Sequence, residues 1–296
     1  MGEQLCTAGE VELCYETFGD PADPALLLTM GLATQMLGWH EDLCAELADR
    51  GFFVIRYDNR DVGRSQRMTG RVPSTFELLR RDTRAAGYTL ADMAADAVGL
   101  LDHLGIDAAH IAGASMGGMI AQTMAAQHPD RVHSLVSIMS NTGARWSGRP
   151  SLRMYGVLLK APPRDRASYM DHAVTLFSRI GSPDLERDDE DLRRIAGMCF
   201  DRGINRAGTA RQIAAIIASG DRTVLLRTIV APTLVIHGTR DKLVPPSGGR
   251  ATARAIPGAR LLMIEGMGHD LPRAAWPRML DAIEQNAARA GAPTAA

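Results

Sequence analysis

A serine, an aspartate and a histidine stand in the order and in the local settings that nucleophilic catalysis needs. The serine lies in Gly113-Ala114-Ser115-Met116-Gly117, which matches the pattern Gly-x-Ser-x-Gly, and Asp241 and His269 follow it along the chain. A serine hydroxyl needs a base, and a neutral imidazole needs a carboxylate that fixes its tautomer. We therefore predict that Ser115 attacks a carbonyl carbon, that His269 moves the proton and that Asp241 orients the imidazole.

The geometry of the turn explains why this pattern contains two glycines. A nucleophile on a sharp turn between a strand and a helix brings the two backbones together, so Gly113 and Gly117 must lack side chains. The turn follows a strand-like run at 110–113 and precedes a helix predicted to reach about Gln127. The Met116 N–H at the start of that helix would then point at a developing oxyanion. The alternative is a small-residue turn without chemistry.

Short apolar runs of strand length recur between longer amphipathic segments. Near-continuous hydrophobicity over five or six residues is typical of strands that are covered on both faces, as in a parallel sheet. The segment from Thr89 to Gly105 is predicted to be a helix, with Thr89 as N-cap and Asp92 in the capping-box position. Strand and helix in alternation predict a doubly wound α/β sheet. The predicted strands are residues 25–30, 52–57, 110–113, 135–139, 233–236 and 261–264.

The alternation stops in the middle of the chain. Residues 141–220 contain no strand-like run, and their pattern is helical with breaks at proline and glycine. We predict that this segment is a helical cap inserted into one core domain, which comprises residues 1–140 and 221–296. Below, "the cap" means residues 141–220.

Composition excludes several classes of partner. The 296 residues include 33 Lys+Arg and 34 Asp+Glu, for a net charge of -1, which is too balanced for phosphate-backbone binding, so nucleic acid is excluded. No apolar run approaches the roughly 18–20 residues that span a bilayer, and the N-terminal segment has no signal-like apolar stretch. We expect a cytoplasmic monomer or homodimer without a membrane partner. The four cysteines have no CxxC spacing, so neither a disulfide framework nor a metal site is predicted.

The chain resembles the α/β-hydrolase fold family from about residue 9 to residue 285, the cap excepted. Besides the turn at Ser115, the resemblance includes Met30-Gly31-Leu32, the segment 58–65 and Gly266-Met267-Gly268-His269. The order Ser, Asp, His on successive strand ends is that of the family. The resemblance implies a mostly parallel eight-stranded sheet with the cap inserted after strand 6. It also assigns the second oxyanion donor to the Leu32 N–H, beside the Met116 N–H.

Within the family, the chain looks most like the anthracycline methylesterases. The similar segments are 18–28, 54–58 and 266–269. Those enzymes hydrolyse a carbomethoxy ester on a polyketide, so the resemblance implies an ester substrate with a small alcohol.

Residues near the predicted strand ends are candidates for substrate contact. The substrate-binding candidates are Gly31, Trp39, Met139, Val244 and Met267. Flexible thioethers would line a pliable apolar pocket, although simple core filling is the favoured alternative for Met119 and Met139. The methionines in question are Met30, Met36, Met116, Met119, Met139 and Met267. The cap residues that could close the pocket are Tyr155, Leu158, Leu159, Tyr169 and Phe177.

The sequence therefore predicts a serine carboxylesterase that acts on small to medium apolar esters, methyl esters among them, with no metal and no organic cofactor. Three alternatives keep the same triad: a cofactor-free perhydrolase or haloperoxidase-like enzyme, a lactonase, and a carbon–carbon bond hydrolase. Serine at the turn argues against epoxide hydrolases and haloalkane dehalogenases, which place aspartate there. A non-catalytic receptor of the same fold is a further alternative. A complete Ser, Asp, His set with both glycines favours catalysis over that alternative.

Overall fold

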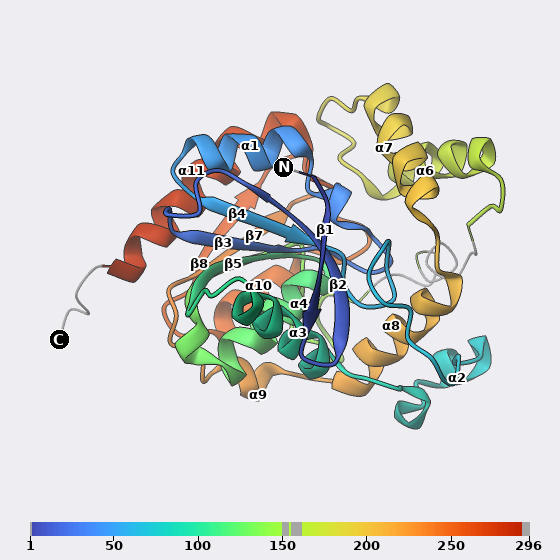
Figure 1. Cartoon of the computed structure of the whole chain (residues 1–296), viewed down its shortest axis with the longest axis horizontal. Helices are drawn as coiled ribbons and strands as arrows, with labels where there is room; N and C mark the ends of the chain where they lie inside the picture. Colours follow the sequence, from blue (N-terminus) through green and yellow to red (C-terminus); the bar gives the residue numbers. More distant parts are fainter. Residues whose placement is uncertain (1, 150–153, 155–161, 292–296) are drawn as a thin grey trace.

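The protein is built around one eight-stranded sheet. Figure 1 shows this sheet between two groups of helices. The computed structural model describes residues 2–149, 154 and 162–291. The strand order is β1-β2-β4-β3-β5-β6-β7-β8; β1, β2 and β4 pair antiparallel and all other neighbours pair parallel. The strands are β1 (Gln4–Ala8), β2 (Val11–Phe18), β3 (Ala25–Thr29), β4 (Phe53–Tyr57), β5 (Ala109–Ala114), β6 (Val132–Ile138), β7 (Thr233–Gly238) and β8 (Arg260–Ile264). The predicted doubly wound, mostly parallel sheet is confirmed.

Helices cover both faces of the sheet. Helices α1 and α11 lie on one face, and α3, α4, α9 and α10 lie on the other (Figure 1). The helices are α1 (Glu41–Asp49), α2 (Thr75–Arg80), α3 (Leu90–His103), α4 (Met116–Gln127), α6 (Arg166–Ile180), α7 (Asp189–Arg202), α8 (Arg206–Ser219), α9 (Thr223–Leu226), α10 (Ser247–Ala255) and α11 (Trp276–Ala288). No helix in the described ranges is long and apolar enough to cross a membrane.

The central strands are buried on both faces, as their unbroken apolar runs predict. All five residues of β3 are buried. Because successive side chains of a strand point to opposite faces, Leu27 packs beneath α3 and α4, whereas Leu26 and Leu28 pack beneath α1 and α11. The sheet is therefore the middle layer of three, and its carboxyl edge is free to carry loops with chemistry.

Helix α3 begins and ends where its sequence signals predict. The Thr89 hydroxyl accepts a hydrogen bond from the Asp92 N–H, and the Asp92 carboxylate accepts one from the Thr89 N–H at 2.7 Å. Gly105, with φ of +68°, follows the last turn. A glycine tolerates this left-handed conformation without steric cost, which is why it ends helices so often.

Helices α6, α7 and α8 follow β6 and belong to the predicted cap. The part of this segment that the structure describes contains no strand. Helix α8 contacts the core directly, because Leu78 of α2 packs against Ala214 and Ile217 of α8. The cap is thus fastened to the core at the side of the sheet where the strands end (Figure 1).

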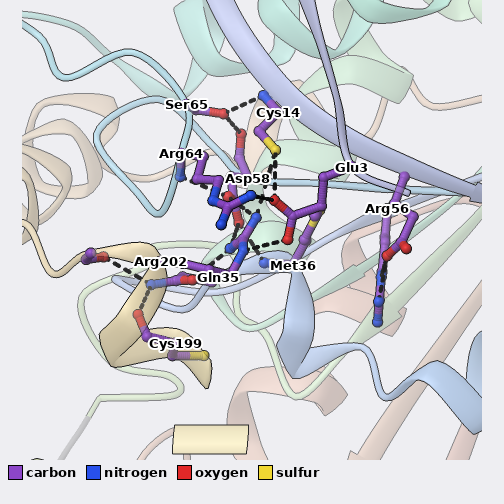
Figure 2. A network of polar contacts seen from close by, with 12 residues as sticks. Glu3, Cys14, Gln35, Met36, Arg56, Asp58, Arg64, Ser65, Cys199 and Arg202 are labelled. Carbon is purple, nitrogen blue, oxygen red and sulfur yellow. Dashed lines mark hydrogen bonds and ion pairs between the residues drawn. The ribbon is translucent and has the colours of Figure 1, made fainter. Parts of the chain in front are cut away.

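A buried ion pair at the end of α7 joins the cap to the core, as Figure 2 shows. The Arg202 guanidinium donates to the carboxylate of Asp58 at 2.8 Å and to that of Glu3 at 2.7 Å. Asp58 follows β4 and is fully buried, and its carboxylate also accepts from the Met36 N–H at 2.8 Å. Burial lowers the pKa of Arg202, but its hydrogen bonds and attraction to Asp58 and Glu3 outweigh burial and raise it. The guanidinium therefore stays charged.

A second buried ion pair joins α8 to the core. The Arg211 guanidinium donates two hydrogen bonds to the Asp61 carboxylate, at 2.8 and 2.7 Å. The Asp61 side chain is 0% exposed and that of Arg211 is 6% exposed. The Tyr88 hydroxyl and the Asn205 amide donate to the same carboxylate. Bidentate pairing of this kind fixes orientation as well as position.

We expect Arg211→Met to lower the free energy of unfolding by about 3–5 kcal/mol, because the Asp61 carboxylate would stay buried without its counter-charge. Urea unfolding measures the change. The matched control is Arg166→Met, which breaks the pair with Asp201; both partners of that pair are about half exposed, and we expect no measurable change. Equal losses in the two variants would contradict a role for Arg211 in fastening the cap.

Candidate active site

Four loops meet at the carboxyl edge of the sheet. They follow β3, β5, β7 and β8, which are parallel strands, so all four leave the sheet at the same edge. Ser115 directly follows β5, Asp241 lies three residues after β7, and His269 lies five residues after β8. In a sheet of this kind ligands bind at this edge.

The turn at Ser115 is tight and strained. Ser115 has φ of +57° and ψ of −117°, which is unfavourable for a residue with a side chain. A Cβ atom at Gly113 would lie 2.2 Å from the Gly117 carbonyl oxygen, and one at Gly117 would lie 2.1 Å from the Thr29 carbonyl oxygen. Both predicted glycines are thus required by close backbone contact. Strain at such a position is typical of functional sites.

The three predicted catalytic side chains form one chain of hydrogen bonds. The Ser115 hydroxyl lies 3.0 Å from His269 Nε2, to which it donates, and His269 Nδ1 donates to Asp241 Oδ2 at 2.7 Å. With this tautomer, Nε2 is free to accept the serine proton. The geometry is that of a nucleophile, a base and a group that orients the base.

Asp241 is held rigidly below the histidine. Its Oδ1 accepts from the Leu243 N–H at 2.9 Å and from the Val244 N–H at 2.8 Å. Burial raises the pKa of Asp241, but the nearby His269 and His237 outweigh burial and lower it to about 2. The carboxylate is therefore ionised at neutral pH.

His237 supports the same loop. Its Nε2 lies 2.8 Å from the Val244 carbonyl oxygen and 3.5 Å from Asp241 Oδ2, and its side chain is fully buried. The ring nitrogen of His237 is thus engaged within the acid loop, and the imidazole that contacts the Ser115 hydroxyl is that of His269.

The two backbone N–H groups predicted to hold the oxyanion belong to the residue after Ser115 and to the loop after β3. Met116 is the first residue of α4, and Leu32 follows Gly31 in the loop after β3. A Cβ atom at Gly31 would lie 3.1 Å from Ser115 Cβ, so this loop passes directly over the nucleophile. Within the described residues neither N–H has an acceptor in the protein. Both groups can therefore donate to a substrate oxygen.

The loop that carries His269 is docked on the end of α6. The His269 N–H donates to the Ile180 carbonyl at 2.8 Å, and the Gly268 N–H donates to the Ser182 hydroxyl at 2.9 Å. The Asp270 carboxylate accepts from the Ser182 hydroxyl and N–H, so it is engaged with the segment after α6. The cap thus contacts the loop of the base directly.

A cavity of about 1830 Å³ lies between the core and the cap, with Ser115 and His269 in its wall. Its core side includes Gly31, Leu32 and Met116 together with the predicted contacts Met139 and Val244. Its cap side combines apolar side chains with a charged segment at 186–191. The apolar side chains include Tyr169, Leu176, Phe177, Leu192, Ile195, Ile213, Ile216 and Ile217, and the charged ones include Glu186, Arg187, Asp188, Asp189 and Asp191. Four of the six methionines singled out by the sequence line it, namely Met30, Met116, Met119 and Met139.

Some predicted contacts require correction. Trp39 and Met267 are 1% and 0% exposed, and neither is among the described residues that line the cavity. Both side chains pack in the core beneath α1 and α11, because they point toward the sheet and not toward the cavity. Met36 is fully buried as well. Of the cap candidates, Tyr155, Leu158 and Leu159 lie outside the described residues.

The sequence did not predict the role of several polar residues near the site. Gln35 and Gln212 connect the loop after β3 to the cap, and Arg202 and Arg211 bind Asp58 and Asp61. The only available signal was the segment 58–65, which the resemblance had marked without giving its partners. Their partners lie about 150 residues away in the sequence, and no local pattern predicts such pairs.

Comparison with known proteins gives a consistent match. The model of the alpha/beta hydrolase fold family matches residues 24–272. Rhodomycin D methylesterase DauP of Streptomyces sp. strain C5 is 30% identical, over 96% of this chain and 97% of its own length. The 3-oxoadipate enol-lactonase 2 of Acinetobacter baylyi is 27% identical over 88% of this chain and 87% of its own length.

Solved structures agree with this result. A thermophilic esterase from Thermogutta terrifontis superimposes with a TM-score of 0.73 at 26% identity, and the match covers 99% of this chain and 100% of the esterase. The predicted resemblance to methylesterases is confirmed by the curated relatives.

Proposed function

Since the chain belongs to the alpha/beta hydrolase fold family, we propose that it is a carboxylesterase that cleaves its substrate through Ser115, His269 and Asp241. The observation that supports this proposal is the unbroken chain of hydrogen bonds from the Ser115 hydroxyl through His269 to the buried Asp241, at the wall of the cavity. We also propose that residues 141–220 form the cap and the rest of the chain the core domain.

The proposed reaction has two halves. Ser115 Oγ attacks the ester carbonyl carbon while its proton passes to His269 Nε2, and the carbonyl oxygen becomes an oxyanion held by the Leu32 and Met116 N–H groups. His269 then gives the proton to the leaving alkoxide, so an alcohol departs and an acyl-enzyme remains. Water attacks the acyl-enzyme by the same steps and releases the acid. Each oxyanion donor is worth roughly 3 kcal/mol of barrier in comparable hydrolases.

The cavity has room for an ester with a bulky acid, and the names of the methylesterase relatives favour a small alcohol. Its volume of about 1830 Å³ is larger than the roughly 300–1,000 Å³ of ordinary ligand sites, and its wall as a whole is mainly apolar. A multi-ring acid would fill such a space and bury much apolar surface. Methyl esters of this kind also agree with the name of the relatives that are 29% and 30% identical, the rhodomycin D methylesterases.

A second candidate is lactone hydrolysis. The enol-lactonase relative supports it, and a lactone is an ester within a ring, so the same attack and the same oxyanion apply. The two candidates differ in the leaving group, which stays attached to the acid in a lactone. Relative rates on the two substrate classes therefore separate them.

The direct test is hydrolysis of p-nitrophenyl esters from acetate to decanoate, methyl esters of multi-ring acids, and simple lactones. We expect turnover of the aryl esters and the highest kcat/KM on a bulky methyl ester. Higher kcat/KM on lactones than on every methyl ester would favour the second candidate. Binding of these compounds without any turnover would instead support the non-catalytic receptor.

The pH dependence should show one proton on the acid side. Asp241 has a pKa of about 2 in the folded protein, below its ordinary value of 3.8. Its ionised form therefore stabilises the fold above the ordinary value, and that contribution is lost as the pH falls toward 2. Asp241 therefore adds no protonation step to the reaction above about pH 4.

We expect log(kcat/KM) to fall with a slope no steeper than about one as the pH decreases to about 4, because Asp241 takes up no proton there. Initial rates on a p-nitrophenyl ester, measured in buffers of constant ionic strength, give the slope. A slope near two would mean that a second group is protonated there, and would contradict an ionised Asp241.

A further inference from the structure

The loop over Ser115 is bound to the cap as well as to the core. We call residues 30–36 the oxyanion loop. The Gln35 amide donates to the Cys199 and Gly203 carbonyls at 2.8 and 3.0 Å, and Figure 2 shows Gln35 beside Arg202 at the end of α7. The Ala33 N–H donates to Gln212 Oε1 at 2.9 Å. Two helices of the cap therefore contact a loop that carries a proposed oxyanion donor.

Gln212 is well placed to fix this loop. It lies on α8 and is 0% exposed. While its Oε1 accepts from the Ala33 N–H, its Nε2 donates to the Arg60 carbonyl at 2.9 Å. The amide is thus anchored on the core at one end and holds the oxyanion loop at the other. A buried amide with both ends paired has one orientation.

The oxyanion loop needs such a restraint at Ala33. The Thr34 N–H donates to the Gly31 carbonyl at 3.2 Å, which closes a turn with Leu32 and Ala33 at its centre. Ala33 has φ of +54°, a conformation that favours glycine at this position of a turn. Rotation of the Leu32–Ala33 peptide would relieve the strain, but it would break the bond to Gln212. It would also alter the backbone next to the Leu32 N–H.

We propose that Gln212 is a positioning residue of the reaction: it holds the Leu32–Ala33 peptide so that the Leu32 N–H faces the oxyanion. The proposal rests on the proposed esterase function. It means that the cap does more than enclose substrate, because the oxyanion site is complete only when α8 is docked on the core.

The test variant is Gln212→Met, which keeps the length of the side chain and removes both hydrogen bonds. We expect kcat on a p-nitrophenyl ester to fall about 10- to 100-fold with KM within about twofold, because the loss concerns the transition state. An alkylboronic acid, which forms a tetrahedral adduct on Ser115, should bind more weakly by the same factor as kcat/KM. Gln212→Asn, which is too short to reach Ala33, should give the same pattern if the methionine variant does not fold.

The matched control is Ser219→Ala. Ser219 also lies on α8, about two helical turns from Gln212, and its hydroxyl accepts from the Leu90 N–H of the core at 2.9 Å. This variant removes the same kind of fastening, and we expect its kcat to stay within about twofold of the wild type. The proposal would be overturned if kcat fell no more in Gln212→Met than in Ser219→Ala. It would also be overturned if Gln212→Met raised KM and left kcat unchanged.

A rescue distinguishes positioning from a general weakening of the fold. Ala33→Gly in the Gln212→Met background should recover kcat several-fold, because glycine adopts φ of about +54° without strain. No recovery would contradict the proposal. If the wild type hydrolyses no ester at all, the proposed function fails first; if it does and Gln212→Met hydrolyses equally well, only the role of Gln212 fails.

Discussion

Ser115→Ala is expected to lower kcat on any ester substrate by about 10⁶-fold, as removal of the nucleophile does in other triad enzymes. Without the hydroxyl no acyl-enzyme forms, and the oxyanion donors can only assist direct attack by water. The folded structure should survive, since alanine adopts the same strained turn with a smaller side chain. Steady-state rates and the thermal unfolding temperature check both parts.

The matched control is Ser140→Ala. Ser140 is a second buried serine near the same turn, since a Cβ atom at Gly118 would lie 2.7 Å from its Cβ. Its hydroxyl has no hydrogen-bond partner among the described residues, and it does not line the described cavity. We expect its kcat to stay within a few-fold of the wild type. Comparable losses in the two variants would mean that Ser115 acts through the fold instead of as the nucleophile.

Asp241→Asn is expected to lower kcat by about 10⁴-fold. Oδ1 of Asp241 accepts two backbone N–H groups, from Leu243 and Val244, so the amide oxygen of the variant must take that place. The amide NH₂ must then face His269 Nδ1, which is now 2.7 Å from Oδ2. This forces the imidazole to carry its proton on Nε2, where it cannot accept the serine proton. The loss thus comes from the wrong tautomer.

The double variant Ser115→Ala with Asp241→Asn tests this reading of the loss. Since the aspartate acts only through His269 and Ser115, the double variant should be no slower than Ser115→Ala alone. Additive losses would show that Asp241 contributes by another route. Circular dichroism of each variant shows whether the fold is retained.

The turn at Ser115 could be predicted from sequence because its requirements are local. Close backbone contact excludes side chains at Gly113 and Gly117, and the neighbouring apolar run and helix pattern place the turn between a strand and a helix. The core strands could also be predicted from a local pattern, because burial on both faces requires a continuous apolar run. The two N-terminal strands have no such run, and only the resemblance gave the number eight.

The contents of the cavity were less predictable. A methionine or tryptophan near a strand end is apolar whichever way it points, so the sequence could not distinguish Met139, which lines the cavity, from Met267 and Trp39, which pack in the core. Direction depends on the path of each loop, and loop paths depend on contacts between distant segments.

The contacts between cap and core were not predictable at all. Arg202 and Arg211 are ordinary helix residues in the sequence, and Gln212 has no neighbour that marks it. Their partners are separated from them by 144 to 199 residues. Pairs of this kind exist only once the chain has folded. The triad, in contrast, was predictable because each member follows a strand whose end is fixed by the sheet.

The most direct test of the central claim, that Ser115 is an activated nucleophile, is labelling with a fluorophosphonate followed by peptide mass spectrometry. The phosphorus is attacked by the serine oxygen and fluoride leaves, so the adduct reports the same activation as ester cleavage. We expect one adduct per chain, on the peptide that contains Ser115, and no adduct in Ser115→Ala. Absence of labelling in the folded wild type, or an adduct on another residue, would contradict the account.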